Sequence, residues 1–229
     1  MRLHTYEWGT GDRTAVLVHG IMSDHRTWRR VGPALAARGY RVIGVDLRGH
    51  GRSGRDEYGA HLFADDLVET LPPGIELALG HSLGALALSL AVERLAPARV
   101  VYSDPAWALG DIELDAALLV AFRSASRADI ASLNPRWEAE DVDLELATLN
   151  LWDPGTALSL SGAEAVNRIP ERAVVPSLVQ IADPSDFVSE PLRQKLEGSG
   201  FEVRTVAGAG HSIHRDDFDG FMKSLEGWS

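Results

Sequence analysis

One serine in this chain is placed where a polypeptide can turn it into a nucleophile. Ser82 is the centre of the pattern Gly80-x-Ser82-x-Gly84, between a short apolar run (75–79) predicted as a strand and a longer one (83–95) predicted as a helix. Such a strand-to-helix turn is sharp and strained, so it needs small residues at both ends, and it exposes the serine Oγ. The N-terminus of the following helix favours a developing negative charge. We predict that Ser82 attacks a carbonyl carbon.

A histidine in a similar position supplies the base that such a serine needs. His211 follows the glycine-rich loop 208–210, after the last predicted strand (201–206) and before the last predicted helix (216–225). A histidine on a loop at the carboxyl end of a strand can reach a serine at a neighbouring strand end and take its proton. We therefore predict that His211 is the general base.

The base in turn needs a carboxylate that holds its tautomer and stabilises its cation. Asp183 and Asp186 follow the predicted strand 178–181, and Asp104 follows the predicted strand 99–102. We favour Asp183, because it comes directly after its strand and the sheet would anchor its backbone. Asp186 and Asp104 remain open as alternatives.

Two backbone N–H groups are needed to bind the oxygen of a tetrahedral intermediate. One is predicted to be that of Leu83, the residue after the nucleophile. The other is predicted to be that of Ile21, in the loop after the early strand 15–18, where Gly20 lets the backbone approach closely.

The elements that must position these residues alternate along the chain. Apolar runs predict strands, and longer amphipathic runs between them predict helices at 27–38, 61–71, 83–95, 191–197 and 216–225. A further strand is possible at 3–8. Alternation of this kind predicts an α/β protein with a mostly parallel, doubly wound sheet and helices on both faces.

The alternation stops between Pro105 and Pro176, where only helical periodicity remains, as in 114–130 and 140–149. A helical insertion that starts at the carboxyl end of a strand is placed to cover the ligand crevice of the sheet. We therefore expect a core made of residues 1–104 and 177–229 and a helical cap at 105–176. Aromatic candidates for an apolar substrate pocket are Trp28, Trp107, Trp137, Trp152 and Phe122.

Composition excludes several other classes of function. The 229 residues carry a net charge of −11 and contain no cysteine. The acidity argues against nucleic acid as a partner, and the lack of cysteine excludes a thiol nucleophile or thiolate metal site. No run is long enough to span a membrane, and the N-terminus lacks the apolar run of a signal peptide, so we expect a cytoplasmic protein. We expect no metal and no organic cofactor.

Together these motifs resemble the α/β-hydrolase fold family over essentially the whole chain. The resemblance rests on four motifs in the family's order: His19-Gly20 with Trp28, Asp46-Leu-Arg-Gly-His-Gly-Arg-Ser53, Gly80–Gly84, and Gly208-Ala-Gly-His211. Family members commonly place the acid about three residues after a glycine that ends its strand. Here Ala182 replaces that glycine and Ser185 occupies the usual position of the acid.

The resemblance implies a serine hydrolase that cleaves a small carboxylic ester or thioester through an acyl-enzyme. Serine at position 82 disfavours the dehalogenases and epoxide hydrolases of the family, which use aspartate there. A C–C bond hydrolase or a haloperoxidase-like perhydrolase is an alternative within the fold. A non-catalytic receptor for a small ligand is the alternative of a different class.

Overall fold

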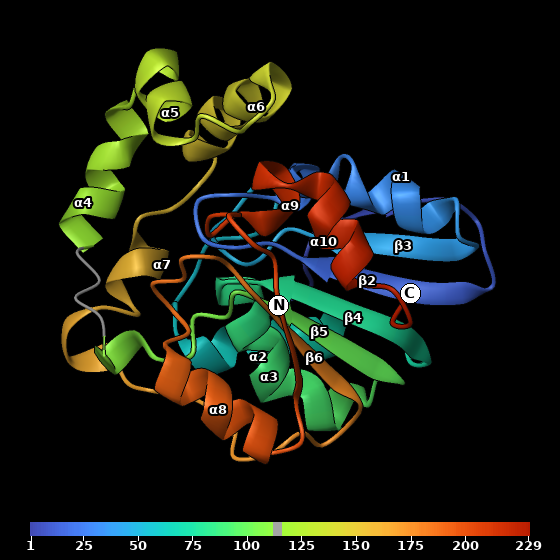
Figure 1. Cartoon of the computed structure of the whole chain (residues 1–229). Helices are drawn as coiled ribbons and strands as arrows, with labels where there is room; N and C mark the ends of the chain where they lie inside the picture. Colours follow the sequence, from blue (N-terminus) through green and yellow to red (C-terminus); the bar gives the residue numbers. More distant parts are fainter. Residues whose placement is uncertain (112–115) are drawn as a thin grey trace.

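The computed structural model describes residues 1–111 and 116–229. Its centre is a seven-stranded sheet with the order β1-β3-β2-β4-β5-β6-β7, in which only β1 runs antiparallel to its neighbour (Figure 1). The strands are β1 (Thr5–Trp8), β2 (Arg13–Val18), β3 (Tyr40–Val45), β4 (Ile75–His81), β5 (Arg99–Ser103), β6 (Ser177–Ile181) and β7 (Glu202–Thr205). The predicted mostly parallel α/β fold is confirmed.

Helices cover both faces of this sheet (Figure 1). On one face lie α1 (Val31–Ala36), the short α9 (Ile213–Asp216) and α10 (Phe218–Ser224). On the other lie α2 (Ala60–Thr70), α3 (Leu83–Leu95) and α8 (Glu190–Gly198). The predicted helix 27–38 is divided into a 3₁₀ turn, η1 (His25–Trp28), and α1, and the predicted helix 216–225 is divided into α9 and α10.

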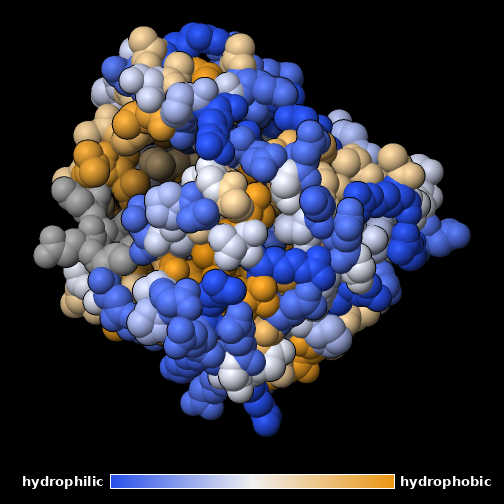
Figure 2. Space-filling model, viewed as in Figure 1, coloured by the Kyte–Doolittle hydropathy of each residue, from blue (hydrophilic) through white to orange (hydrophobic). Residues whose placement is uncertain are grey.

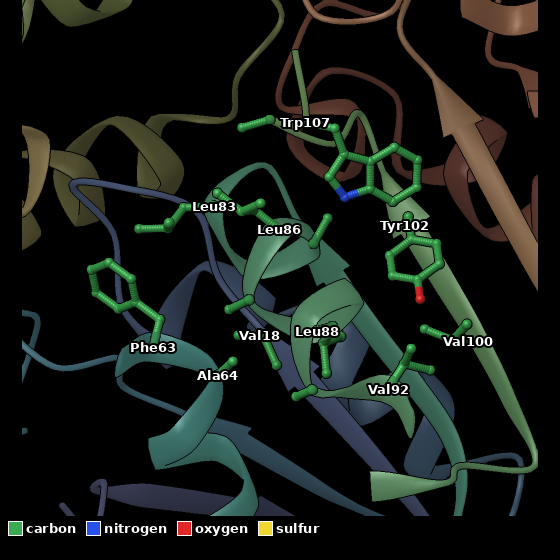
Figure 3. Close-up of a cluster of buried hydrophobic side chains, with 14 of the residues drawn as sticks. Val18, Phe63, Ala64, Leu83, Leu86, Leu88, Val92, Val100, Tyr102 and Trp107 are labelled. Atoms are coloured by element: carbon green, nitrogen blue, oxygen red, sulfur yellow. The ribbon is translucent and has the colours of Figure 1, made fainter. Parts of the chain in front are cut away.

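The larger of the two apolar cores that flank the sheet holds the helix that carries the nucleophile motif. Leu83, Leu86 and Leu88 of α3 pack against side chains of α2 and of the central strands, with no more than 2% exposure. Figure 3 shows this cluster, with Tyr102 of β5 and the indole of Trp107 at one end of it. Because α3 is buried along this whole side, its first turn is held rigidly against the sheet.

Between β5 and β6 the described chain is helical. It contains η2 (Leu109–Asp111), α4 (Ala116–Ala121), η3 (Phe122–Ser124), α5 (Arg127–Leu133), α6 (Ala139–Leu149), α7 (Gly155–Leu158) and η4 (Gly162–Glu164). The predicted helix 114–130 begins outside the described residues, and its remainder is divided among α4, η3 and α5. Figure 1 shows α5 and α6 beyond the end of the sheet, with α4 beside them.

A row of ion pairs attaches α6 to the core. The guanidinium of Arg29 donates to Glu138, Glu140 and Asp141, and Arg30 donates to Glu138. The carboxylate of Asp141 is buried, whereas those of Glu138 and Glu140 are exposed. The start of α6 is thus held to the segment around η1 mainly by charge.

No helix within the described residues has the length and apolar character needed to cross a membrane. The orange surface in Figure 2 gathers beside α4. The exposed leucines of the chain include Leu118, Leu133 and Leu158, all from the segment between β5 and β6.

The contact between α3 and β2 yields a prediction about stability. A Cβ on Gly84 would lie 2.3 Å from the carbonyl oxygen of Val18 and 2.5 Å from that of His19. Gly84→Ala should therefore lower the free energy of unfolding by about 3 kcal/mol or prevent folding, since neither backbone atom can move away easily. Chemical denaturation followed by circular dichroism measures the loss.

Gly198→Ala is the matched control. Gly198 ends α8, and a Cβ there would meet no atom within 4 Å. This variant should be unchanged or more stable by up to about 1 kcal/mol, because alanine restricts the unfolded chain. A Gly84→Ala protein as stable as wild type would show that the contact at the start of α3 is loose.

Candidate active site

The turn that carries Ser82 has the strained geometry that the sequence predicts. Ser82 has φ 52° and ψ −115°, between the end of β4 and the start of α3. A Cβ on Gly80 would lie 2.6 Å from the backbone of Gly84, so the turn closes only because position 80 is glycine. The Ser82 N–H donates to the carbonyl of Ser103 at 3.0 Å, which fixes the turn to the neighbouring strand β5.

His211 is oriented by a carboxylate, as predicted, but this carboxylate belongs to Asp104. The Nδ1 of His211 lies 2.6 Å from Oδ2 of Asp104. Because a carboxylate only accepts, Nδ1 carries the hydrogen and the lone pair of Nε2 is free to accept a proton. The imidazole ring also stacks on Phe187, with ring centroids 4.4 Å apart.

Asp104 is fully buried, at 0% exposure, just beyond the end of β5. Its Oδ1 accepts from the N–H of Ala182 at 3.2 Å and from the hydroxyl of Ser185 at 2.7 Å. With His211 on the other oxygen, the carboxylate has donors for its charge even though water is excluded. Ser185 thus stands where the family resemblance places the acid, and there it donates to Asp104 at the end of the neighbouring strand β5.

The preference for Asp183 is corrected by this geometry. Asp183 is exposed, its N–H donates to the carbonyl of Ala209, and its Oδ2 accepts from the N–H of Gly208 at 3.2 Å. Its side chain is therefore engaged with the backbone of the histidine loop, and it makes no contact with the imidazole. Asp186 is also exposed and has no hydrogen bond to His211.

Both amide groups predicted to bind an oxyanion are available. Ile21 lines the same pocket as Ser82, and Leu83 is the first residue of α3. Within residues 1–111 and 116–229, the N–H of neither residue donates a hydrogen bond. A Cβ on Gly20 would lie 2.8 Å from Nδ1 of His81, so a larger residue there would separate the two loops.

Backbone strain gathers around these residues. The described non-glycine residues with positive φ are Ala96 at the end of α3 and three others that surround the site: Met22 (64°), Ser82 (52°) and Asp104 (41°). Strained backbone of this kind persists only where surrounding packing imposes it, and it is concentrated at functional sites.

These residues open onto a cavity of about 410 Å³, within the usual range for small-molecule sites. Its apolar walls come from the oxyanion loop, from the helices between β5 and β6, and from the residue stacked on His211. They are Ile21, Met22, Leu119, Phe122, Leu133, Trp137 and Phe187. The polar part of the lining includes Thr27, Asn134, Glu145, Arg215 and Asp216.

Of the predicted aromatic wall, Trp137 and Phe122 line this cavity. Trp28 and Trp107 are corrected to core residues, each at 0% exposure in one of the two apolar cores. Trp152 is likewise buried, and its indole N–H donates to Thr156. Large aromatic rings fill cores efficiently, which is why residue type alone did not separate the two roles.

Buried neutral histidines surround the base. Burial is the main reason why the pKa of His81 lies well below its ordinary value, and the positive charge of His211 is the second reason. Burial does the same to the pKa of His214. His81 donates from Nε2 to the carbonyl of His211 at 2.9 Å, because a carbonyl can only accept. The two histidines therefore support the loop without adding positive charge beside an imidazolium.

Several residues of the cavity wall could not be predicted from the sequence. Phe187, Glu145 and Arg215 come from three different segments, and only folding brings them to the cavity. The position of Ser185 relative to the strand end did single it out. A serine at that point does not, however, predict a hydrogen bond to Asp104.

One described group of side chains has the composition of a metal site. His4, His25 and Asp46 bring one ligand atom each within 4.8 Å of the others. Asp46 is already occupied, since Oδ1 accepts from the N–H and Nδ1 of His25 and Oδ2 accepts from the N–H of Arg52. Burial alone would raise the pKa of Asp46, but these donors and the nearby His19 hold it low. These hydrogen bonds therefore stabilise the loop 46–53.

Comparison with known proteins agrees with this fold. The model of the alpha/beta hydrolase family matches residues 15–223. Epoxide hydrolase A of Mycobacterium tuberculosis is 38% identical over 96 residues, which cover 38% of this chain and 30% of that protein. A probable esterase of Oryza sativa (PIR7A) is 38% identical over 93 residues, 37% of this chain and 35% of that protein.

The chain thus spans only about a third of these curated relatives, and 17% of the bifunctional epoxide hydrolase 2 of Sus scrofa.

Solved structures match over the full length. E-2-(acetamidomethylene)succinate hydrolase superposes with a TM-score of 0.81 at 23% identity, over 99% of this chain and 94% of that one. The N-formylmaleamic acid deformylase of Pseudomonas putida S16 gives 0.76 at 22%, over 97% and 95%. At these identities the likeness shows the fold alone, but the sequence model covers most of the chain. The chain belongs to the alpha/beta hydrolase family.

Proposed function

We propose that this protein is a serine hydrolase that cleaves a small carboxylic ester or thioester through an acyl-enzyme. The observation that carries the proposal is the assembly at one cavity of Ser82 on its strained turn and His211 paired with the buried Asp104. A non-catalytic receptor on the same fold would have no need of a buried carboxylate that orients an imidazole.

In the proposed reaction, each group of the site has one step. Nε2 of His211 takes the proton of the Ser82 hydroxyl as Oγ attacks the carbonyl carbon, and the N–H groups of Leu83 and Ile21 stabilise the oxyanion. The imidazolium then donates its proton to the leaving alcohol or thiol. Asp104 stabilises this cation and keeps hydrogen on Nδ1. Water repeats the cycle on the acyl-enzyme and releases the acid.

We also propose that residues 105–176 act as a cap that selects the substrate, with residues 1–104 and 177–229 as the core. Supporting this, Phe122, Leu133 and Trp137 from that segment line the cavity that Ser82 also lines. The comparison with a probable esterase is compatible with an ester, and serine at position 82 favours an ester over an epoxide. A small molecule is thus the expected partner.

The first prediction concerns the nucleophile. A fluorophosphonate probe should label the wild-type protein once, on Ser82, and Ser82→Ala should abolish both labelling and turnover of p-nitrophenyl acetate. Intact-mass spectrometry and absorbance at the nitrophenolate band give the two readings. Ser89→Ala, at a serine of α3 whose hydroxyl bonds the carbonyl of Leu86, is the control and should keep labelling. Labelling that survives in Ser82→Ala would rule the proposal out.

The second prediction concerns the acid. Asp104→Asn should lower kcat by about four orders of magnitude, because the amide can donate to Nδ1 and so favours the wrong imidazole tautomer. Asp183→Asn should stay within about threefold of wild type, since that side chain contacts only the backbone N–H of Gly208. Both are assayed at one pH, with folding checked by circular dichroism. If kcat fell in Asp183→Asn and stayed near wild type in Asp104→Asn, Asp183 would be the acid.

The third prediction separates pocket from core in the proposed cap. Trp137→Ala should change the preference among p-nitrophenyl esters of graded acyl length with only a small fall in melting temperature. Trp152→Ala should instead cost about 3–5 kcal/mol of stability, because a fully buried indole leaves a cavity. Proportional losses on every ester in Trp137→Ala, parallel to its stability, would make Trp137 a core residue too.

A further inference from the structure

The base of the proposed reaction is held in place by few polar contacts. Within the part of the chain that the structure describes, one hydrogen bond holds the imidazole of His211, the bond between Nδ1 and Oδ2 of Asp104. The χ2 torsion of a histidine has broad minima, so one bond at Nδ1 does not by itself set the tilt of the ring. The side chain is also 37% exposed, so packing does not enclose it. The direction of Nε2 therefore depends on the groups that touch the faces of the ring.

Phe187 packs against one face of this imidazole. The two ring centroids lie 4.4 Å apart and the ring planes are inclined by 27°, so the rings are stacked. Phe187 is half-buried and lines the same cavity as Ser82 and His211. The face of a phenyl ring carries negative partial charge, so it attracts the imidazolium that forms when His211 takes a proton.

The loop that carries Phe187 is attached to the acid of the site. The hydroxyl of Ser185 donates to Oδ1 of Asp104 at 2.7 Å. The same hydroxyl accepts from the backbone N–H groups of Phe187 and Val188, at 3.1 and 3.0 Å. The other oxygen of Asp104 faces Nδ1 of His211. The phenyl ring and the imidazole are thus both positioned relative to the same buried carboxylate.

The ring of His81 also contacts the imidazole, but in a different way. Its centroid lies 4.6 Å from that of His211, with the planes inclined by 45°, and its Nε2 donates to the backbone carbonyl of His211. His81 thus fixes the backbone of the histidine loop. The stacked contact with the imidazole itself is made by Phe187.

We propose that Phe187 is a positioning residue, which sets the tilt of the His211 imidazole and stabilises its cation during proton transfer. The proton moves from Oγ of Ser82 to Nε2 and then to the leaving oxygen or sulfur. Ser185 holds the phenyl ring in place through the backbone of its loop. Because the cation forms only after the substrate has bound, the contribution of Phe187 falls on kcat more than on KM. The inference rests on the proposed hydrolase function.

The test removes the aromatic face and keeps an apolar side chain. Phe187→Leu should lower kcat about 3- to 30-fold on every p-nitrophenyl ester of a graded acyl series, because an aliphatic group does not attract the cation. KM should change by less than about threefold. Phe187→Tyr keeps the aromatic face and should stay within about threefold of wild type. A Phe187→Leu protein that kept its kcat, and changed only KM or acyl-length preference, would make Phe187 a cavity wall and overturn the proposal.

Phe201→Leu is the matched control for the loss of a ring. Phe201 is buried, its ring packs near those of Tyr102 and Trp107, and it does not line the cavity. This variant should lower the melting temperature and leave kcat unchanged. If kcat fell equally in Phe201→Leu and Phe187→Leu, both losses would come from stability, and the proposal would be overturned.

A double-mutant cycle tests the attachment through Ser185. Ser185→Ala removes the hydroxyl that joins the loop to Asp104, so it should lower kcat as well. If Phe187 acts from the place that Ser185 gives it, Phe187→Leu should cost less in the Ser185→Ala background, by a factor of about three or more. Losses that multiply without coupling would show that Ser185 does not hold Phe187 in place.

A spectroscopic measurement separates failure of this inference from failure of the proposed function. The Nδ1 proton of His211 gives a low-field proton NMR signal as long as its bond to Asp104 opens rarely, because exchange with water reports opening. If no ester is hydrolysed and Ser82 is not labelled, the hydrolase proposal fails, and this signal decides the positioning role alone. Exchange about threefold or more faster in Phe187→Leu than in wild type and Phe187→Tyr supports it. Equal exchange in all three proteins, or no such signal in wild type, refutes it.

Discussion

The site depends on one buried negative charge. A carboxylate at 0% exposure is tolerated only if its oxygens receive donors, and Asp104 receives them from Ala182, Ser185 and His211. This requirement fixes the loop after β6 and the loop after β7 relative to the end of β5. The imidazole is therefore oriented by the same contacts that make burial of the charge affordable. The hydroxyl of Ser185 also accepts from the N–H groups of Phe187 and Val188, which shapes the loop behind the ring.

Much of the scaffold could be predicted from local pattern. Buried parallel strands read as continuous apolar runs, and all of the predicted strands were found, including β1. The glycine requirement at Gly80 is likewise local, because it concerns a single tight turn. Ser82 could be selected because it directly follows a strand, and His211 because the glycine-rich loop before it follows one. The parallel sheet brings both loops to one edge.

The acid could not be selected in this way, because all three candidates follow strands and the choice depends on contacts across the sheet. Anchoring of the backbone was the wrong criterion: Asp183 is anchored, through Ala209, but its side chain binds Gly208. Asp104 is the candidate that contacts His211, because β5 lies between β4 and β6 and its end is central to the edge where the loops meet. The predictions for Trp28, Trp107 and Trp152 were wrong for a related reason, because periodicity does not say which side of a helical segment faces a cavity.

The ion pairs that hold α6 have a consequence beyond the shape of the cavity. Arg29 and Arg30 form partly exposed ion pairs with the acidic start of α6. Dissolved salt screens the attraction between exposed charges, with a screening length of about 10 Å at 0.1 M salt. The same helix carries Glu145, which contacts Arg215 in the cavity wall. Ionic strength therefore acts on the attachment of α6 much more than on Asp104, whose carboxylate is fully buried.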